Sequence, residues 1–348
     1  MSNSPKILVI GLGGIGGVVS SYLLETGCDV TGITTNSQVL TELEAEGFRA
    51  TNHTGKSWQV RGRVFASIPS DERFDLILLA TQPTQAEEAA VSAFPFLSDE
   101  GVFVCFQNGL LEERLASRFG ERRVVGAVVA WGASSPKPGI YLRTSAGGFI
   151  LGRLSEPADE PVRRLARLLE TIGEVTVTDN LAGSRWSKLA INCAVSSLGA
   201  VSGQPLGRLL MNSKARRLAL EIMTEVVIVA REEQIQLKKI SGTLDLEWIA
   251  LNKGRGQSNF EASIFVKHLV MLAVGFRYRK LRSSMLYALE KGRTPPVDFL
   301  NGEVVTRGRS KNIEVSVNET VQKFVHSIAR SEKRSSMSTL SELYAATR

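Results

Sequence analysis

Residues 7–16 read ILVIGLGGIG, and this stretch decides the fold of the chain. Four apolar residues predict a buried strand, and glycines follow it at positions 11, 13 and 16 in the spacing GxGxxG. In a strand–turn–helix unit that binds a dinucleotide, the first glycine allows the tight turn, the second lets the backbone approach a pyrophosphate, and the third lets the helix pack against the strand. The free N–H groups at the helix N-terminus then face the phosphates. The predicted phosphate-binding residues are Gly11, Leu12, Gly13, Gly14, Ile15 and Gly16.

The spacing GxGxxG is weak evidence alone, because a purely structural glycine-rich turn can produce it. Here both flanks agree with a nucleotide-binding unit. A buried strand precedes the glycines, and residues 18–24 (VVSSYLL) follow them with helical spacing. We therefore favour the dinucleotide interpretation over the structural turn.

Length and composition indicate a globular protein with two domains. The chain has 348 residues, of which 43% are hydrophobic and 22% charged, enough to bury a substantial core. The net charge of +7 is spread along the chain, with basic clusters at 277–282 and 307–311 and no accompanying DNA- or RNA-binding motif. We expect solvated basic faces that attract anionic small molecules, and no nucleic-acid partner.

Cysteine usage and hydropathy predict a cytoplasmic protein. Cys28, Cys105 and Cys193 are widely spaced and odd in number, which favours free thiols in a reducing compartment. The glycine turn interrupts the first apolar run, unlike a signal peptide, and the longest apolar stretch, about 269–276, is too short to span a bilayer. We expect no membrane partner. The three histidines are scattered, so we expect no metal site.

The first half of the chain alternates buried strands and helices. Strands are expected at 28–33, 74–80 and 101–106, with helices at 37–47 and 86–94 between them. Near-continuous apolar strands separated by helices are typical of a parallel sheet covered on both faces. Further short strands are expected to extend this sheet in antiparallel fashion, at 124–130, 140–142, 148–151 and 174–178. A helix is expected at 161–172, and residues 134–139 are predicted to form a turn.

From about residue 181 the pattern becomes helical and stays so. Helices are expected at 184–201, 212–235, 244–252, 258–290 with a break near Gly275, 296–311 and 317–330. The tail, 331–348, is either a flexible segment or a short helix. The sequence thus predicts an α/β protein, with a Rossmann-like doubly wound sheet in residues 1–180 and an all-helical domain in 181–348. The cleft between two such domains is the expected small-molecule site.

Lys188 and Asn192 stand four residues apart in the predicted helix 184–201, so both side chains lie on one face, which Ser196 continues. The residues between them are apolar. A lysine held there loses hydration and its pKa falls towards neutrality, which suits a general acid that protonates a developing alkoxide. The alternative is that Lys188 extends to water and Asn192 caps a neighbouring element. The pattern alone leaves both open.

Four motifs in order resemble those of the ketopantoate reductase (2-dehydropantoate 2-reductase) family. Besides the N-terminal glycines, they are, in chain order, Gln107-Asn108-Gly109 after a predicted strand, Lys188-Leu-Ala-Ile-Asn192-Cys, and RSSML at 282–286 followed by DFLNG at 298–302. Together they span roughly residues 6–320. The resemblance implies NADPH-dependent reduction of a 2-keto acid, as in the ketopantoate-to-pantoate step of pantothenate biosynthesis.

The resemblance also implies roles for single residues. Lys188 would be the proton donor to the carbonyl oxygen, and Asn108 would contact both cofactor and substrate. Asn192, Ser196 and Ser284 would bind the substrate, Ser284 through its carboxylate.

Three positions depart from the family's pattern. Pro296 stands where the family usually has a glutamate, and Ser196 and Leu206 stand where it has asparagines. A pocket that has lost polar groups predicts a larger or less polar substrate than ketopantoate, so a related reductase of a less polar carbonyl or imine is the close alternative. The extra sequence at 230–270 could be a lid, a dimer contact or an inert extension, and a homodimer stays open.

Cofactor preference follows from the residues after the second and third strands. Thr34, Thr35 and Asn36 include no acid, which argues against strict NAD use. The family's arginine there is absent, and its lysine after the third strand is Gln82. Hydroxyl and amide groups hold a 2′-phosphate more weakly than arginine does, so we predict NADP with modest affinity. The absence of these cations also leaves open a non-catalytic NADP-binding sensor, although a sensor has little use for Lys188.

Overall fold

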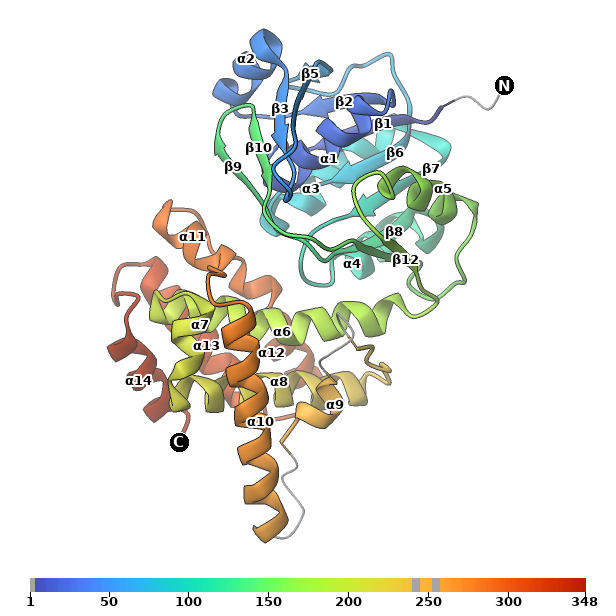
Figure 1. The fold of residues 1–348 in the computed structure, drawn as a ribbon. Helices are drawn as coiled ribbons and strands as arrows, with labels where there is room; N and C mark the ends of the chain where they lie inside the picture. The colour runs from blue at the N-terminus through green and yellow to red at the C-terminus, as the bar shows by residue number, and fades with distance from the viewer. Residues whose placement is uncertain (1–3, 240–244, 252–256) are drawn as a thin grey trace. The chain divides into compact units, whose positions relative to one another are not determined.

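The computed structural model describes residues 4–239, 245–251 and 257–348, with side chains from residue 263 onward in the last range. The chain divides into two compact units, Met1–Leu181 and Ala182–Arg348 (Figure 1). The first unit contains the sheets and the second is helical. The predicted α/β class, with a doubly wound sheet followed by a helical region, is confirmed.

The main sheet of the first unit has the strand order β12-β11-β8-β7-β6-β1-β2-β5. Its described strands pair in parallel, apart from β8 and β11, which are antiparallel. The expectation of antiparallel extension is therefore right for β11, beside which β12 runs in parallel, and wrong for β8, which joins β7 in parallel. It is also wrong for the expected strand 140–142, which forms but belongs to a second sheet. The strands are β1 Lys6–Ile10, β2 Asp29–Ile33, β5 Arg63–Phe65, β6 Phe74–Leu79, β7 Leu97–Cys105, β8 Val124–Val129, β11 Phe149–Gly152 and β12 Val175–Val177.

Helices cover both faces of this sheet. On one face, Val18 of α1 and Leu165 of α5 join the core beneath Ile7 and Val9 of β1. On the other, Ala86 of α3 and Leu115 of α4 join a separate core with the alternate residues of the strands, as the period of two requires. The helices are α1 Gly14–Glu25, α2 Ser37–Glu46, α3 Pro83–Ala93, α4 Leu111–Phe119 and α5 Glu160–Leu169, with short 3-10 turns η1 Phe94–Phe96 and η2 Glu121–Arg123.

A second sheet, which the sequence did not predict, packs over α1. Its strand order is β4-β3-β10-β9, with β3 Phe48–Thr51, β4 Ser57–Val60, β9 Ala133–Lys137 and β10 Ile140–Arg143. The expected turn at 134–139 is wrong for most of its length, because only Pro138 and Gly139 lie between the two strands. The buried Tyr141 fixes this sheet to the glycine turn after β1, since its hydroxyl donates to the Leu12 carbonyl oxygen at 3.2 Å.

The second unit is a bundle of helices that includes the long α6, most of whose residues are buried (Figure 1). Apolar residues of α6 and α8 supply much of its core, and Leu189, Ala190, Cys193, Leu220 and Val226 are at most 1% exposed. The helices are α6 Leu181–Ser202, α7 Leu206–Met211, α8 Ser213–Glu232, α9 Leu246–Ile249, α10 Gln257–Arg277, α11 Ser284–Glu290, α12 Asn301–Ser310, α13 Ser316–Ala329 and α14 Met337–Ala346, with the 3-10 turn η3 Pro296–Phe299.

Several predicted boundaries in this unit need correction. Gly275 lies inside α10, and the break comes after Arg277. The expected helix 296–311 is divided at Leu300 into η3 and α12. The tail forms α14, while α7 was not predicted at all. The ends of the expected helix 244–252 lie outside the described residues, and its ordered part is α9.

Candidate active site

The glycine turn after β1 has room for a pyrophosphate. Gly11 adopts a positive φ of 98°, and a Cβ there would lie 2.8 Å from the Thr81 nitrogen. A Cβ on Gly16 would lie 2.0 Å from the Gly11 carbonyl oxygen, so this position needs a glycine for packing. A Cβ on Gly13, at the N-cap of α1, would meet nothing within 4 Å. The turn is thus tight where it packs and open beside the first N–H groups of α1, which fits a bound dinucleotide.

Strand register brings the other predicted cofactor residues to the same edge of the sheet. Ile10 pairs with Ile33 and Leu79, and Leu79 pairs with Cys105. Because these parallel strands end level with one another, the segments that follow them lie along one carboxyl edge. This edge carries the predicted set Gly11–Gly16, Thr34–Asn36, Gln82 and Asn108. Ligands of open α/β sheets bind at this edge.

Two side chains after β2 already hold the local backbone. The Asn36 Oδ1 accepts a hydrogen bond from the Val39 N–H at 3.1 Å and caps α2. The buried Thr34 hydroxyl oxygen accepts from the Asn36 N–H at 3.3 Å. Thr35 is exposed. The Asn36 amide nitrogen and the Thr35 hydroxyl are therefore the groups that this loop can offer a nucleotide.

Gln107, for which the sequence predicted no structural role, connects the segments that follow β6 and β7. The buried Gln107 donates from Nε2 to the Thr81 carbonyl oxygen at 3.3 Å. Its neighbour Asn108 is exposed, as is Gln82 at the N-cap of α3. Gln107 thus fixes the loop, and Asn108 is the side chain that extends from it.

In the second unit, α6 carries Lys188, Asn192 and Ser196 on successive turns. Lys188 is half-buried, and burial, with the Arg185 charge as a second cause, lowers its pKa to about 7. The Asn192 Nδ2 is buried and makes no hydrogen bond to any described residue. A buried amide donor without a partner costs free energy, so the Asn192 Nδ2 is available to a ligand. The same face of α6 therefore carries this donor and a lysine that exchanges its proton near neutral pH.

A serine that the sequence reasoning missed fixes α11 against this helix. The Ser283 hydroxyl donates to the Ser196 carbonyl oxygen at 2.6 Å and accepts from the Leu286 N–H at 3.1 Å. It thus caps α11 and ties its first turn to α6. The predicted substrate residue Ser284 is the next residue, exposed at the start of α11. A serine before a helical run is a recognisable N-cap signal.

A buried polar network holds the middle of α6. The Asn301 Nδ2 donates to the Cys193 carbonyl oxygen at 3.2 Å and to the Asn318 Oδ1 at 2.9 Å. Asn318 in turn donates to Glu225 Oε2 at 2.7 Å and to the Ile222 carbonyl oxygen at 3.2 Å. The network joins α6, α12, α13 and α8 next to Asn192. The polar residues Glu225 and Asn318 within apolar helical runs were the available signal for it.

The positions that depart from the family's pattern are built into the scaffold. Leu206 is buried and opens α7, and its N–H donates to the Leu281 carbonyl oxygen at 2.9 Å. Pro296 begins η3, where a proline is well placed. Asp298 of the same turn lies 2.8 Å from His326 Nε2, so this histidine ties η3 to α13.

Comparisons with known proteins agree along most of the chain. Residues 7–156 match the family described as ketopantoate reductase PanE/ApbA, and residues 180–329 match ketopantoate reductase PanE/ApbA C terminal. The 2-dehydropantoate 2-reductase of Pyrococcus horikoshii is 24% identical over 314 residues, which cover 90% of this chain and 94% of that protein. YkpB of Bacillus subtilis, described as an uncharacterized oxidoreductase, is 23% identical over 320 residues, which cover 91% of this chain and 96% of that protein.

Solved structures share the fold. A PanE/ApbA family ketopantoate reductase from Ralstonia eutropha JMP134 has a TM-score of 0.79 at 24% identity, covering 94% of this chain and 99% of that one. D-mandelate dehydrogenase in a ternary structure with NADH and anilino(oxo)acetate has a TM-score of 0.78 at 20% identity, with the same coverage. Within the described ranges, no helix is long and apolar enough to cross a bilayer. With both halves of the chain matched in order, the protein belongs to the ketopantoate reductase family of oxidoreductases.

Proposed function

We propose that this protein is an NADPH-dependent reductase of 2-keto acids in which Lys188 donates the proton. The observation that carries the proposal is that α6 presents Lys188 one turn from the buried Asn192 Nδ2, which has no hydrogen-bond partner among the described residues. Burial also lowers the pKa of Lys188 to about 7. An ordinary lysine, with a pKa of about 10.4, is a weak proton donor at neutral pH. A donor with a pKa near the working pH combines a usable protonated fraction with a favourable proton transfer.

When bound, a reduced nicotinamide would supply a hydride for the carbonyl carbon of the substrate. The Lys188 Nζ then delivers its proton to the oxygen of the same carbonyl, on which negative charge develops. In the transition state the ammonium group also stabilises that charge, an interaction that is stronger there than in the ground state. The product is a 2-hydroxy acid, and the neutral lysine regains its proton from water.

Other residues of the chain would bind and orient the reactants. The buried Asn192 Nδ2, which has no partner among the described residues, would donate to the substrate. The exposed hydroxyl of Ser284, fixed by its neighbour Ser283, would hold the carboxylate. Ser196 would add a weaker contact on the same helix face. The glycine turn and the exposed Asn108 would hold the cofactor's pyrophosphate and ribose end.

Two substrates are candidates. The first is ketopantoate, the substrate in the names of several relatives. The second is a larger, less polar 2-keto acid, favoured because Leu206 and Pro296 occupy usually polar positions. D-mandelate dehydrogenase, which has a closely similar fold, holds the aromatic anilino(oxo)acetate in its solved structure. An aryl 2-keto acid is therefore a specific alternative to ketopantoate.

The test is oxidation of NADPH and of NADH, followed at 340 nm, with a panel that contains ketopantoate, a branched aliphatic 2-keto acid and phenylglyoxylate. We expect turnover with NADPH, and the kcat/KM values rank the two candidate substrates. Clear nucleotide binding without turnover on any panel member would instead favour the sensor. A protein that binds neither nucleotide would contradict the proposed function as a whole.

A further inference from the structure

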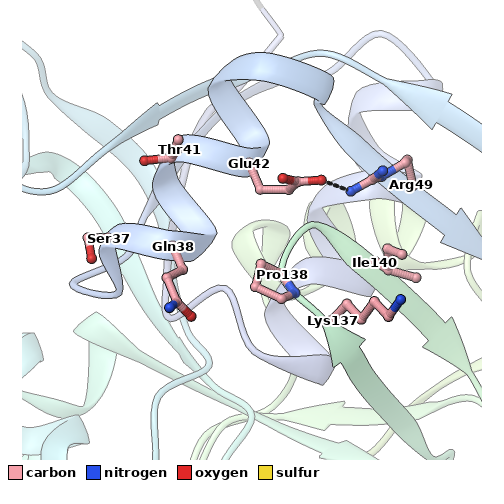
Figure 2. A pocket seen from close by; sticks show the side chains of 8 residues that line it. All are labelled: Ser37, Gln38, Thr41, Glu42, Arg49, Lys137, Pro138 and Ile140. Atoms are coloured by element: carbon pink, nitrogen blue, oxygen red, sulfur yellow. Dashed lines mark hydrogen bonds and ion pairs between the residues drawn. The ribbon is translucent and has the colours of Figure 1, made fainter.

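A cavity of about 620 Å³ lies between α2 and the tip of the β9–β10 hairpin, within the first unit. Gln38 and Ser37 contribute from the α2 side, and Lys137 and Pro138 from the hairpin. Figure 2 shows the α2 side chains and the hairpin side chains on opposite sides of this space. Most of its lining residues are polar or charged, although their apolar parts contribute to the walls as well, so it differs from a core void lined by aliphatic and aromatic side chains.

The charges around this cavity favour an anion. Glu42 and Arg49 form an ion pair with each other (Figure 2), so their charges cancel. Lys137 is exposed and makes no ion pair with any described residue. One uncompensated positive charge therefore remains, with the Gln38 amide as a further hydrogen-bond donor. A flexible ammonium beside an amide donor is a common way to hold a phosphate group.

The cavity adjoins the predicted nucleotide site at both of its walls. Ser37, which lines it, directly follows Asn36, the last residue of the predicted ribose loop. At the other wall, β9 begins against the glycine turn, since a Cβ on Gly14 would lie 3.1 Å from the Ala133 carbonyl carbon. The same strand ends at Lys137, four residues or about 13 Å further on. A lysine at this strand end can reach an anion attached to the ribose whose pyrophosphate occupies the turn.

The loop after β2 offers no cation of its own. Thr34, Thr35 and Asn36 provide hydroxyl and amide groups, and Gln82 stands where the family has a lysine. We propose that Lys137, with the Gln38 amide, binds the 2′-phosphate of NADPH and so supplies the preference for NADPH over NADH. This inference rests on the proposed function, because it concerns the cofactor of the same reaction. It assigns the phosphate contact to the second sheet rather than to the loops of the main sheet.

The experiment compares dissociation constants of NADPH and NADH, measured by nicotinamide fluorescence, for the wild type, Lys137→Ala and Lys56→Ala. Lys56 is the matched control, because it is an exposed lysine in the β3–β4 turn of the same unit and does not line the cavity. We expect Lys137→Ala to raise the Kd of NADPH at least tenfold and that of NADH less than twofold. Lys56→Ala should change neither by more than twofold.

Three further measurements test the same electrostatic interaction. Glu42→Gln removes the charge that compensates Arg49, and should tighten NADPH but not NADH. The effect of Lys137→Ala should shrink as salt is raised to about 1 M, where charges in water are screened within about 3 Å. Inorganic phosphate and 2′,5′-ADP serve as competitors, and only 2′,5′-ADP should lose affinity in step with NADPH.

The outcomes separate this inference from the proposed function. Equal NADPH affinities of Lys137→Ala and Lys56→Ala would overturn the assignment of Lys137, while leaving the reductase intact. Equal affinity of the wild type for NADPH and NADH would also overturn it. A wild-type protein that binds neither nucleotide would overturn the proposed function and the assignment together.

Discussion

The Ser283 hydroxyl donates to the Ser196 carbonyl oxygen at 2.6 Å, across 87 residues of sequence. This bond fixes the start of α11, and with it Ser284, against the helix that carries Lys188 and Asn192. Two predicted substrate-binding segments, far apart in the chain, are thus held together by a serine that is not itself predicted to touch the substrate.

Ser283→Ala should weaken both stability and substrate binding. The variant loses the N-cap of α11, worth about 1 kcal/mol, and the bond to Ser196. We expect a measurable loss in the free energy of unfolding, read from urea titrations, and a raised KM for the 2-keto acid. Ser336→Ala removes the equivalent cap of α14 and is the matched control. It should lose similar stability with an unchanged KM, and an equal KM rise in both variants would contradict the positioning role of Ser283.

Lys188→Ala should lower kcat by at least about 10²-fold, the usual scale for removing a general acid. Nucleotide affinity should be largely retained, because the predicted cofactor residues lie in the other unit. Steady-state kinetics and NADPH fluorescence titration measure the two quantities separately. A Lys188→Ala enzyme with nearly full turnover would refute the proton-donor role.

The pH profile of the reduction should follow Lys188. Because only the protonated amine donates, kcat/KM should fall about tenfold per pH unit above a midpoint near 7. The reverse oxidation needs the neutral amine and should rise over the same range. A reduction rate that is flat between pH 6 and 9 would separate Lys188 from the chemistry.

Stability should also depend on this lysine, with a defined sign. The pKa is about 7 in the folded protein and about 10.4 when unfolded, so between these values the unfolded state binds more protons. Stability against unfolding then rises with pH across that window, because the penalty for burying a charged amine is relieved. Lys188→Met should be more stable than the wild type at pH 6, and this advantage should shrink towards pH 10. Thermal melts at a series of pH values measure the difference.

Gly13→Ala and Gly16→Ala should distinguish a glycine that leaves room for the cofactor from a glycine that is needed for packing within the protein. A Cβ at position 13 meets no protein atom within 4 Å, whereas one at position 16 would lie 2.0 Å from a backbone oxygen. Gly13→Ala should melt near the wild type but bind NADPH at least tenfold more weakly. Gly16→Ala should lose stability outright. Retained NADPH affinity in Gly13→Ala would show that the phosphates do not occupy this space.

The buried network around Asn318 should contribute more to stability than an exposed bond of similar length. Asn318→Ala leaves Asn301 and Glu225 without this partner in a buried site, at a cost of about 1–3 kcal/mol. Gln322→Ala removes an exposed bond to Asp298 and should cost much less. Denaturant titrations of the two variants provide the comparison.

The parts of the fold that could be predicted depend on interactions close in sequence. The strand at 7–10 and its glycine turn are encoded within ten residues, and the alternation of apolar strands and helices is local as well. Lys188 and Asn192 share a helix face because a helix repeats every 3.6 residues. The second sheet could not be predicted in this way, although a strand at 140–142 was expected. β3 and β10 lie about ninety residues apart, and each has only four residues.

The sequence by itself determined the Rossmann-like strand–turn–helix, the helical second half and the face of α6 that presents an amine, an amide and a hydroxyl. Only the tertiary structure decided that Ser283 ties Ser284 to that helix, that Asn301 and Asn318 support it, and that Lys137 comes to the end of α2. The physical reason is that period and turn chemistry act between neighbouring residues. Burial, long-range strand pairing and the pKa of Lys188 depend instead on residues that meet only when the chain has folded.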